Sequence, residues 1–410
     1  MQTLRTLLGL ARLAAARAWV AVRPVVGIVT PLGWILAALA LVTGLTGALL
    51  GWPEFRYLAL TLAAGVLVAF AFLVGRARFR VTVELRPRRV VAGERAFGRL
   101  LVVNTGARRS SAGRLELPVG SGQAEFVIPA LPPAGEHEEL FAVPTAKRAV
   151  IVAGPAVSVR GDALGLVRRT VRWSEPVELF VHPRTVRLRP SAAGLVRDLE
   201  GEVTATITNN DLAFHALRPY EPGDDRRYVH WRTTARTGRL MVRQFNETRR
   251  SQLVLLHSAD AAAYPTEEDF ELGVSVLASI AGQVLRDGTR LRVASGAGDH
   301  VAELRTATVT TMLDDSSRIE PTSAGGASVR DLARDATRRM PPPSVLLVVA
   351  GSGTPIADLR AADALFGHDT RTIGLRIEAG AEPRLALVSG LAVVTIGKLA
   401  DLPPLMRKLT

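Results

Sequence analysis

The residue types best able to do chemistry are crowded into residues 217–245, which read LRPYEPGDDRRYVHWRTTARTGRLMVRQF. The adjacent carboxylates of Asp224 and Asp225 could share a divalent cation or shift each other's pKa, and His230 could move a proton. The surrounding arginines neutralise these carboxylates and compete with a cation, because a guanidinium presents a planar fork that fits a carboxylate. A metal-dependent binding protein or a hydrolytic enzyme using these three residues is therefore the alternative hypothesis.

The favoured hypothesis is a clamp of ion pairs at a domain junction, with Tyr220 and Trp231 as its packing anchors. Arginines in excess of the carboxylates would then form a docking surface for an acidic partner. The arginines and acids expected to pair are Arg218, Arg226, Arg232, Arg236, Glu221, Asp224 and Asp225.

Turn-forming residues set the local structure expected for this stretch. Pro222 fixes φ, Gly223 accepts a positive φ, and either following aspartate can cap the next segment. Residues 226–236 are predicted to form one short helix or irregular turn that ends near Gly238. Two strands, RLMVRQF and SQLVLLHS, should follow, so that the segment leads directly into the next domain.

Other catalytic motifs are missing from the sequence. It holds no GxxxxGK[ST] phosphate loop, no G-x-S-x-G elbow and no HExxH zinc motif, and it has no cysteine. The loop at 351–356 begins like a dinucleotide fingerprint, but Ile356 stands where the third glycine is needed. We expect a tight turn there, with Thr354 capping a helix that begins at Pro355. The sequence thus predicts a protein that is not an enzyme and holds no metal or cofactor.

The formal net charge of +13 is concentrated in two segments. Residues 1–80 hold eight arginines and one acid, and residues 218–250 hold nine arginines and four acids. The rest of the chain is nearly neutral, without the basic face and interleaved readers of a nucleic-acid-binding module. Nucleic acid is therefore not expected as a partner.

Two charge-free runs near the N-terminus, at 25–50 and 57–75, are each close to the ~20 apolar residues that cross a bilayer. A transmembrane helical hairpin is predicted over 25–75, after an amphipathic cytoplasmic segment at 1–24. Arginines flank both outer ends, which by the positive-inside rule places the N-terminus and the main domains in the cytoplasm. A cleaved signal peptide is disfavoured because a second span follows. The expected location is the cell (inner) membrane, with the chain crossing it twice.

The remaining chain divides by its hydrophobic period. Short alternating runs over 78–187, separated by Gly, Pro, Asn and Ser, predict an antiparallel β-sandwich. The arginine-rich region at 195–250 leads to residues 251–410, where strands alternate with helices as in an α/β domain with a mostly parallel sheet. The predicted fold class is multi-domain: two transmembrane helices, a β-sandwich and an α/β domain.

The segment RPYEPGDDRRYVHWRTTAR resembles the signature of a bacterial family, the domain of unknown function fifty-eight. Two upstream elements, GDALGLVRR at 161–169 and ELFVHP at 178–183, also resemble elements of that family, with Ala163 in place of a proline. The signature falls on Arg218, Tyr220, Gly223, Asp224, Arg227, Val229, His230, Trp231, Thr234, Ala235 and Arg236. The resemblance covers the paired spans, the β domain and the start of the α/β domain.

The resemblance implies a membrane-anchored cytoplasmic protein with a von Willebrand factor A-like, Rossmann-like C-terminal domain. It also implies association with a MoxR-type AAA+ ATPase and, in some cases, a transglutaminase-like membrane protein. The metal motif of a von Willebrand domain is expected to be lost here, and a shifted remnant formed by Asp260 with Ser258 is the minor alternative. The function that follows is that of a scaffold or adaptor that binds protein partners.

Overall fold

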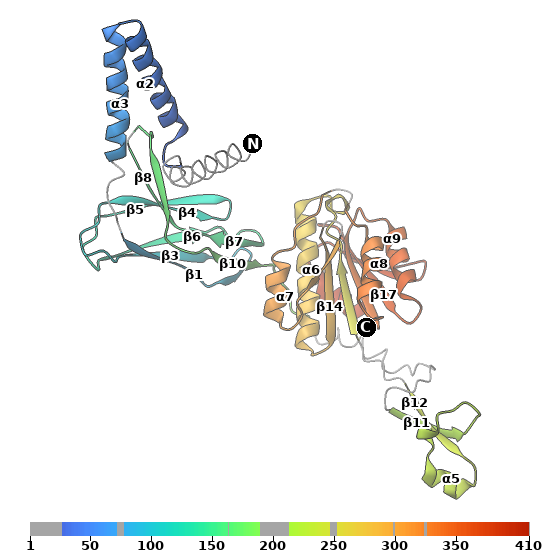
Figure 1. The fold of residues 1–410 in the computed structure, drawn as a ribbon. Coiled ribbons are helices and arrows are strands. Elements are labelled where there is room, and N and C mark those ends of the chain that lie inside the picture. The colour runs from blue at the N-terminus through green and yellow to red at the C-terminus, as the bar shows by residue number, and fades with distance from the viewer. Residues whose placement is uncertain are drawn as a thin grey trace, which may run out of the picture. The chain divides into compact units, whose positions relative to one another are not determined.

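The computed structural model describes residues 27–71, 78–162, 164–188, 213–246, 252–297, 300–323 and 326–409 (Figure 1). The segment predicted as amphipathic, 1–24, lies outside the described residues. The chain forms two compact units: one of residues 1–146 and 150–180, the other of residues 147–149 and 181–410. The second unit thus includes a short segment that comes from inside the predicted β-sandwich sequence.

Two apolar helices follow one another in the first unit, α2 (Pro31–Leu49) and α3 (Pro53–Ala71). Thr30 caps α2 by accepting the N–H of Gly33, and Pro31 suits the first turn, where no intrahelical donor is needed. Each helix has 19 residues, long and apolar enough to cross a membrane by length and composition. At 1.5 Å per residue this is roughly 28 Å, close to the thickness of a hydrocarbon core.

The rest of the first unit is built from β-sheets. Strands β1 (Phe79–Arg86), β3 (Ala96–Asn104) and β6 (Glu136–Val143) form one antiparallel sheet. The other sheet has the order β2-β10-β7-β4-β8-β9, with β5 paired to β4. Its strands are β2 (Arg89–Val91), β4 (Gly113–Val119), β5 (Gly122–Ile128), β7 (Ala149–Ala153), β8 (Val157–Gly161), β9 (Arg168–Arg172) and β10 (Val177–His182).

Alternation along these strands produces the core of the β-sheets. Every second residue of β3 is buried, as expected when one face of a sheet is covered. Rings from the two sheets meet where Phe126 of β5 lies 5.8 Å from Phe141 of β6, measured between ring centroids. The prediction of β-sheets for this region was therefore right, although β2 and β9 were not predicted from the sequence.

A seven-stranded sheet of order β15-β14-β13-β16-β17-β19-β18 forms the centre of the second unit. The five inner strands are parallel, and the edge strands β15 and β18 are antiparallel to their neighbours. The strands are β13 (Gln252–His257), β14 (Arg290–Ala297), β15 (His300–Leu304), β16 (Val345–Gly351), β17 (Arg371–Ile377), β18 (Arg384–Val388) and β19 (Leu391–Ile396).

Helices cover both faces of this sheet (Figure 1). One buried apolar cluster joins a face of the sheet to α6 (Glu267–Arg286), α7 (Val309–Ser316) and α10 (Leu402–Leu409). A second cluster joins the opposite face to α8 (Val329–Arg339) and α9 (Ile356–Phe366). The α/β architecture expected from the alternation of strands and helices is thus present.

The segment 147–149 is tied to α6 through Arg148. Its side chain is buried and makes two hydrogen bonds to the Glu271 carboxylate, at 3.1 and 2.8 Å. It also donates to the carbonyl oxygens of Ser316 and Ser317, each at 3.0 Å. A guanidinium with four such hydrogen bonds is a strong structural contact, because charge-assisted bonds are stronger than neutral ones.

Candidate functional site

The arginine-rich region forms a small two-stranded unit of its own, which we call the motif hairpin (residues 213–246). Strand β11 (Ala213–Pro219) pairs antiparallel with β12 (Met241–Asn246), and these two strands form a separate sheet. Between them lie a 3-10 turn, η1 (Arg226–Tyr228), and a short helix, α5 (Trp231–Thr237). The short helix was predicted, but β12 was expected to lead into the α/β sheet. It pairs instead with β11, which the sequence reading did not identify.

The turn at Gly223, the cap at Asp225 and the helix end at Gly238 form at residues predicted from the sequence. Gly223 has a φ of 114°, which glycine accepts without strain. Asp225 caps η1, and the His230 ring accepts the N–H of Thr233 at the start of α5. Gly238 then ends α5 in the left-handed conformation. His230 is therefore a helix cap whose Nδ1 also lies 2.8 Å from the Thr233 hydroxyl.

Both aspartates of the motif hairpin are held by arginines of the same hairpin. Asp224 receives two bonds from Arg218, at 2.7 and 2.6 Å, and a third from the backbone N–H of Glu221. Asp225 accepts two hydrogen bonds at its Oδ2 atom, from Nε of Arg227 at 2.8 Å and from Nη2 of the same residue at 2.6 Å. The bound guanidinium groups, with backbone N–H donors, lower the pKa of both carboxyl groups below the ordinary value.

This pairing corrects part of the predicted clamp. Arg226, Arg232 and Arg236 were expected to reach the acids, but they are exposed and form no ion pair with any described residue. Trp231 was expected to be a packing anchor, yet 67% of its surface is exposed. The reason lies in α5, whose Thr234 hydroxyl accepts the N–H of Met241 in β12, so that the side carrying Trp231 faces solvent.

We call that side the outer face of α5. Residues at helical spacing share it, because positions three to four apart lie on the same side of a helix. It carries one large aromatic ring and three arginine positions within or just after the helix, with no acid among them. Its members, all exposed, are Trp231, Arg232, Ala235, Arg236 and Arg239.

Replacing Asp224 with asparagine should loosen the motif hairpin alone. The change removes the charge that holds Arg218, so backbone amides in residues 213–246 should exchange hydrogen faster, while β13 and α6 keep their protection. Hydrogen exchange with mass spectrometry measures both. Because the Asp224 pKa is lowered, the wild-type pair should persist as the pH falls through the ordinary aspartate range and be lost only at lower pH, as the pH passes through the lowered pKa. Glu221→Gln, which removes a neighbouring charge, is the control; equal acceleration in both variants would contradict this role for Asp224.

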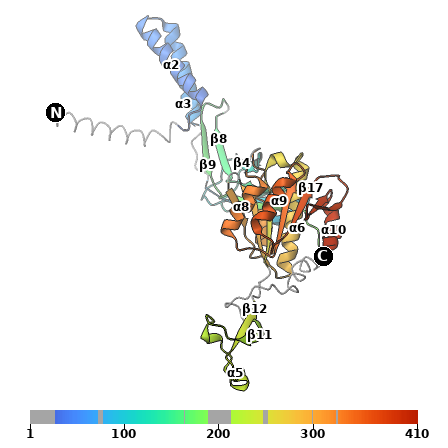
Figure 2. The same cartoon turned by 90° about the vertical axis from the view of Figure 1, so that its right-hand side faces the viewer.

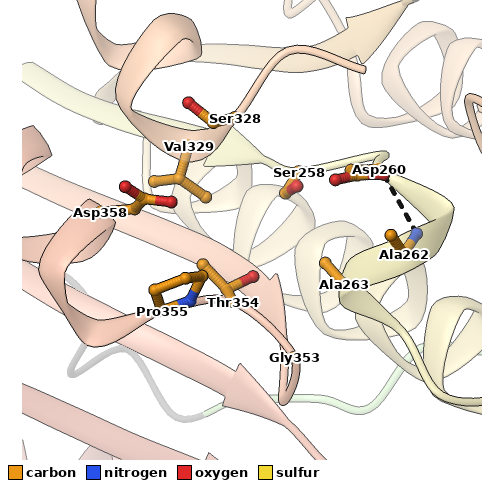
Figure 3. A pocket seen from close by; sticks show the side chains of 10 residues that line it. All are labelled: Ser258, Asp260, Ala262, Ala263, Ser328, Val329, Gly353, Thr354, Pro355 and Asp358. Atoms are coloured by element: carbon orange, nitrogen blue, oxygen red, sulfur yellow. Dashed lines mark hydrogen bonds between the residues drawn. The ribbon is translucent and has the colours of Figure 1, made fainter. Parts of the chain in front are cut away.

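A second candidate site lies at the carboxyl ends of β13 and β16 (Figure 3). The strand order reverses there, since the chain continues from β13 to β14 on one side and later returns to β16 on the other. Doubly wound sheets bind ligands at such a switch point. The pocket has a volume of about 110 Å³ and is lined by Ser258, Asp260, Ala262, Ala263, Ser328, Val329, Gly353, Thr354, Pro355 and Asp358.

Oxygen atoms dominate the polar lining of this switch-point pocket. Asp260 uses one carboxylate oxygen to accept the N–H of Ala262, at 3.0 Å, and Ser328 is occupied in capping α8. Thr354 is buried, and its hydroxyl has no hydrogen-bond partner among the described residues. Within the described parts of the chain, no three His, Cys, Asp or Glu side chains gather as metal ligands would.

Thr354 also corrects an expectation from the sequence. It was expected to cap the next helix, but Pro355 occupies the cap position and α9 begins at Ile356 without a side-chain cap. The switch-point residues Asp358 and Ser328 were not identified from the sequence. Ser328 lies at the start of α8 and Asp358 in the first turn of α9. For Asp358 this position was a usable signal, because a helix that follows a parallel strand starts near the carboxyl end of that strand.

The fold and site define a class of protein: a doubly wound α/β unit that carries an arginine-rich hairpin before its first strand. Residues 216–392, somewhat less than half of the chain, match the family described as "Protein of unknown function DUF58", so this part of the chain is similar to that family. The match begins in the motif hairpin and ends in β19, so it leaves out the apolar helices and β-sheets that the sequence resemblance had included.

A curated relative agrees with this assignment. The chain is 34% identical over 147 residues to "Uncharacterized protein YeaD" of Bacillus subtilis (strain 168), and the match covers 34% of each chain. The chain thus spans about a third of that relative.

Solved structures add little to the family assignment. A CARDB domain from Pyrococcus furiosus shows 13% identity and a TM-score of 0.20, covering 26% of this chain and 93% of that one. The sporulation control protein Spo0M of Bacillus subtilis shows 14% identity and a TM-score of 0.16, covering 36% of this chain and 59% of that one. Likenesses this weak carry no argument about fold or function.

Proposed function

We propose that the protein is a membrane-anchored scaffold or adaptor that binds protein partners through its motif hairpin. Helices α2 and α3 would cross the cell membrane, with the N-terminus and both folded units in the cytoplasm. The arginines at 76, 78 and 80 after the second span support this orientation by the positive-inside rule. The α/β unit would be a von Willebrand factor A-like domain whose metal motif has degenerated.

One observation carries the binding function: the outer face of α5 is exposed and cationic while both nearby aspartates are occupied. Trp and Arg are the residues that most often dominate the energy of protein interfaces. Because Asp224 and Asp225 are held by Arg218 and Arg227, they do not neutralise the arginines on that face. A partner with an acidic surface and a groove for the Trp231 ring would be complementary to it.

The partner proposed from the family resemblance is a MoxR-type AAA+ ATPase, with a transglutaminase-like membrane protein as a further candidate. An ATPase would supply the energy that this chain has no phosphate loop to harness. The clamp at a domain junction is a separate hypothesis. The ion pairs described for the motif hairpin do not support it, because they join residues of the hairpin itself.

A pull-down with the intact, tagged protein tests the partner. We expect the wild type to recover an AAA+ ATPase, and Trp231→Ala or the double variant Arg232→Glu/Arg236→Glu to recover at least about tenfold less. Arg330→Glu/Arg360→Glu, which reverses two exposed charges on α8 and α9, is the matched control and should bind as the wild type does. Recovery of no AAA+ ATPase by the wild type would refute this partner, and equal loss in the control would refute the role of the α5 face.

The rival function is metal-dependent binding or hydrolysis by Asp224, Asp225 and His230. Its residues lie in one hairpin, but Asp224 and Asp225 accept arginine bonds and His230 caps α5, which favours the scaffold. Calorimetry with Mg²⁺ or Mn²⁺ on the full-length protein distinguishes the two. Binding that Asp224→Ala abolishes, in a variant that stays folded, would replace the scaffold proposal with the rival.

A further inference from the structure

The turn between β8 and β9 packs against the ends of both apolar helices, within one unit. Leu166 and Val167 form a buried cluster with Ala69 near the end of α3. The partly buried residues packed on this cluster are Ile28, Val29, Leu36 and Phe70. Figures 1 and 2 show β8 running from the β-sheets to the base of α2 and α3.

Backbone bonds fix the turn at this position. Thr30 donates its N–H to the Leu166 carbonyl at 3.0 Å, and its hydroxyl lies 2.7 Å from the Gly165 carbonyl. Arg168 donates its N–H to the Ile28 carbonyl at 2.7 Å. A side chain at Gly33, in the first turn of α2, would overlap the Leu166 carbonyl oxygen. The turn is therefore level with the first turn of α2.

That level is where a bilayer would begin if α2 and α3 cross it. The two helices have equal length, so Pro31 and Ala71 mark the same boundary of the hydrocarbon core. Carbonyl groups at this depth need internal partners, and Thr30 supplies them for Gly165 and Leu166. Leu164 lies at the tip of the turn with 71% of its surface exposed, which is unfavourable in water and favourable among lipids.

Positive charge follows the turn directly. Arg168 is paired with Glu116 at 3.0 Å, but the exposed Arg169 has no ion-pair partner among the described residues. Asp162, the acid of this turn, is used in shaping it, since it accepts the N–H groups of Leu164 and Val167. An apolar tip followed by an unpaired arginine matches the acyl and headgroup layers of an anionic membrane surface.

We propose that the β8–β9 turn (residues 164–169) is a membrane-contact site, in which Leu164 enters the lipid interface and Arg169 binds anionic phospholipid headgroups. This inference rests on the proposed membrane anchor and adds to it a lipid contact made by the β-sheet unit. The contact would fix the β-sheets against the bilayer at a third point besides the two helices.

Single-cysteine labelling tests this proposal, because the natural chain has no cysteine. The full-length protein with Leu164→Cys is labelled with an environment-sensitive fluorophore and reconstituted into phosphatidylcholine vesicles with or without phosphatidylglycerol. We expect a blue-shifted emission protected from an aqueous quencher, more strongly with phosphatidylglycerol. Leu140→Cys, at a similarly exposed position on β6, is the control, and its label should show the emission of a fluorophore in water and be quenched. Both side chains are exposed, so neither substitution should disturb folding.

Two further variants separate the possible failures. Leu41→Cys, exposed in the middle of α2, reports whether that helix lies in the bilayer. If the label at position 41 lies in lipid but the label at position 164 lies in water, the lipid contact of the turn is overturned while the membrane anchor stands. If the label at position 41 lies in water, the membrane anchor itself is overturned. Arg169→Glu should raise about fivefold the phosphatidylglycerol content that gives half of the shift, and Arg169→Lys should leave it unchanged. A shift independent of phosphatidylglycerol would overturn the headgroup contact.

Discussion

Replacing Gly351 with alanine is expected to destabilise the α/β unit by about 3 kcal/mol. Gly351 ends β16, where η2 (Ala261–Ala263) crosses close to the strand. An added methyl group would overlap the Ala263 carbonyl oxygen, and it would lie 2.6 Å from the Ala263 carbonyl carbon and 2.8 Å from the Tyr264 ring. The backbone of Ala263 cannot yield easily, because its carbonyl also accepts the N–H of Gly353 at 2.9 Å.

Urea unfolding of the full-length protein in detergent micelles, followed by hydrogen exchange in β16 and α6, measures this effect. Gly282→Ala is a matched control inside α6, since a methyl group there meets its nearest atom at 3.5 Å, an ordinary contact. That variant should be as stable as the wild type or slightly more stable, because alanine favours helices. A Gly351→Ala protein with an unchanged urea midpoint would show that η2 moves freely, against the close packing described above.

Acidification below about pH 6.5 is expected to weaken the same unit through His257. Burial, with a smaller contribution from the positive charge of Arg148, lowers the pKa of this histidine to about 3. The neutral ring is held by the Ser295 hydroxyl at 2.9 Å and by Tyr264 at 3.4 Å. Between about pH 3 and 6.5 the unfolded chain therefore binds a proton that the folded chain does not. Stability should rise with pH across this window, by about 1.4 kcal/mol per pH unit.

The histidine contribution is isolated by comparing slopes. The free energy of unfolding is measured against pH, from urea-dependent exchange of β13 amides, for the wild type and for His257→Gln. The variant is expected to be less stable at pH 7, because its side chain fits the Ser295 and Tyr264 partners less well, but its slope should be smaller by up to about 1.4 kcal/mol per pH unit. Equal slopes in the two proteins would mean that His257 is not kept neutral by burial.

The strongest periodic patterns in the sequence predicted the fold well. Charge-free runs identified α2 and α3, and continuous apolar stretches identified β13 and β16, since buried parallel strands show no polar alternation. The missed elements are weakly patterned. Strands β15 and β18 lie at sheet edges with exposed side chains, and α7 is rich in threonine, which has a low helix propensity.

The position of the candidate site in the chain could be predicted from the sequence, but its ion pairs could not. The sequence shows the excess of arginine over acid in the motif hairpin, and it predicts the turn at Gly223. The sequence does not predict which arginine pairs with which acid. Arg218 is positioned by the pairing of β11 with β12, which is a contact between residues distant in the sequence. The exposure of Trp231 likewise depends on which side of α5 its threonines turn inward.

The placement of Arg148 has a consequence for how this protein can be made and divided. The residue precedes Glu271, its carboxylate partner in α6, by 123 positions, so a ribosome delivers the guanidinium long before the helix that receives it. During synthesis the α/β unit therefore stays incomplete until α6 has been made and Glu271 can bind Arg148. A truncated protein that begins after β10 would carry Glu271 and the carbonyl groups of Ser316 and Ser317 without their shared donor. The compact unit that contains the α/β sheet therefore needs a segment that lies outside the α/β sequence itself.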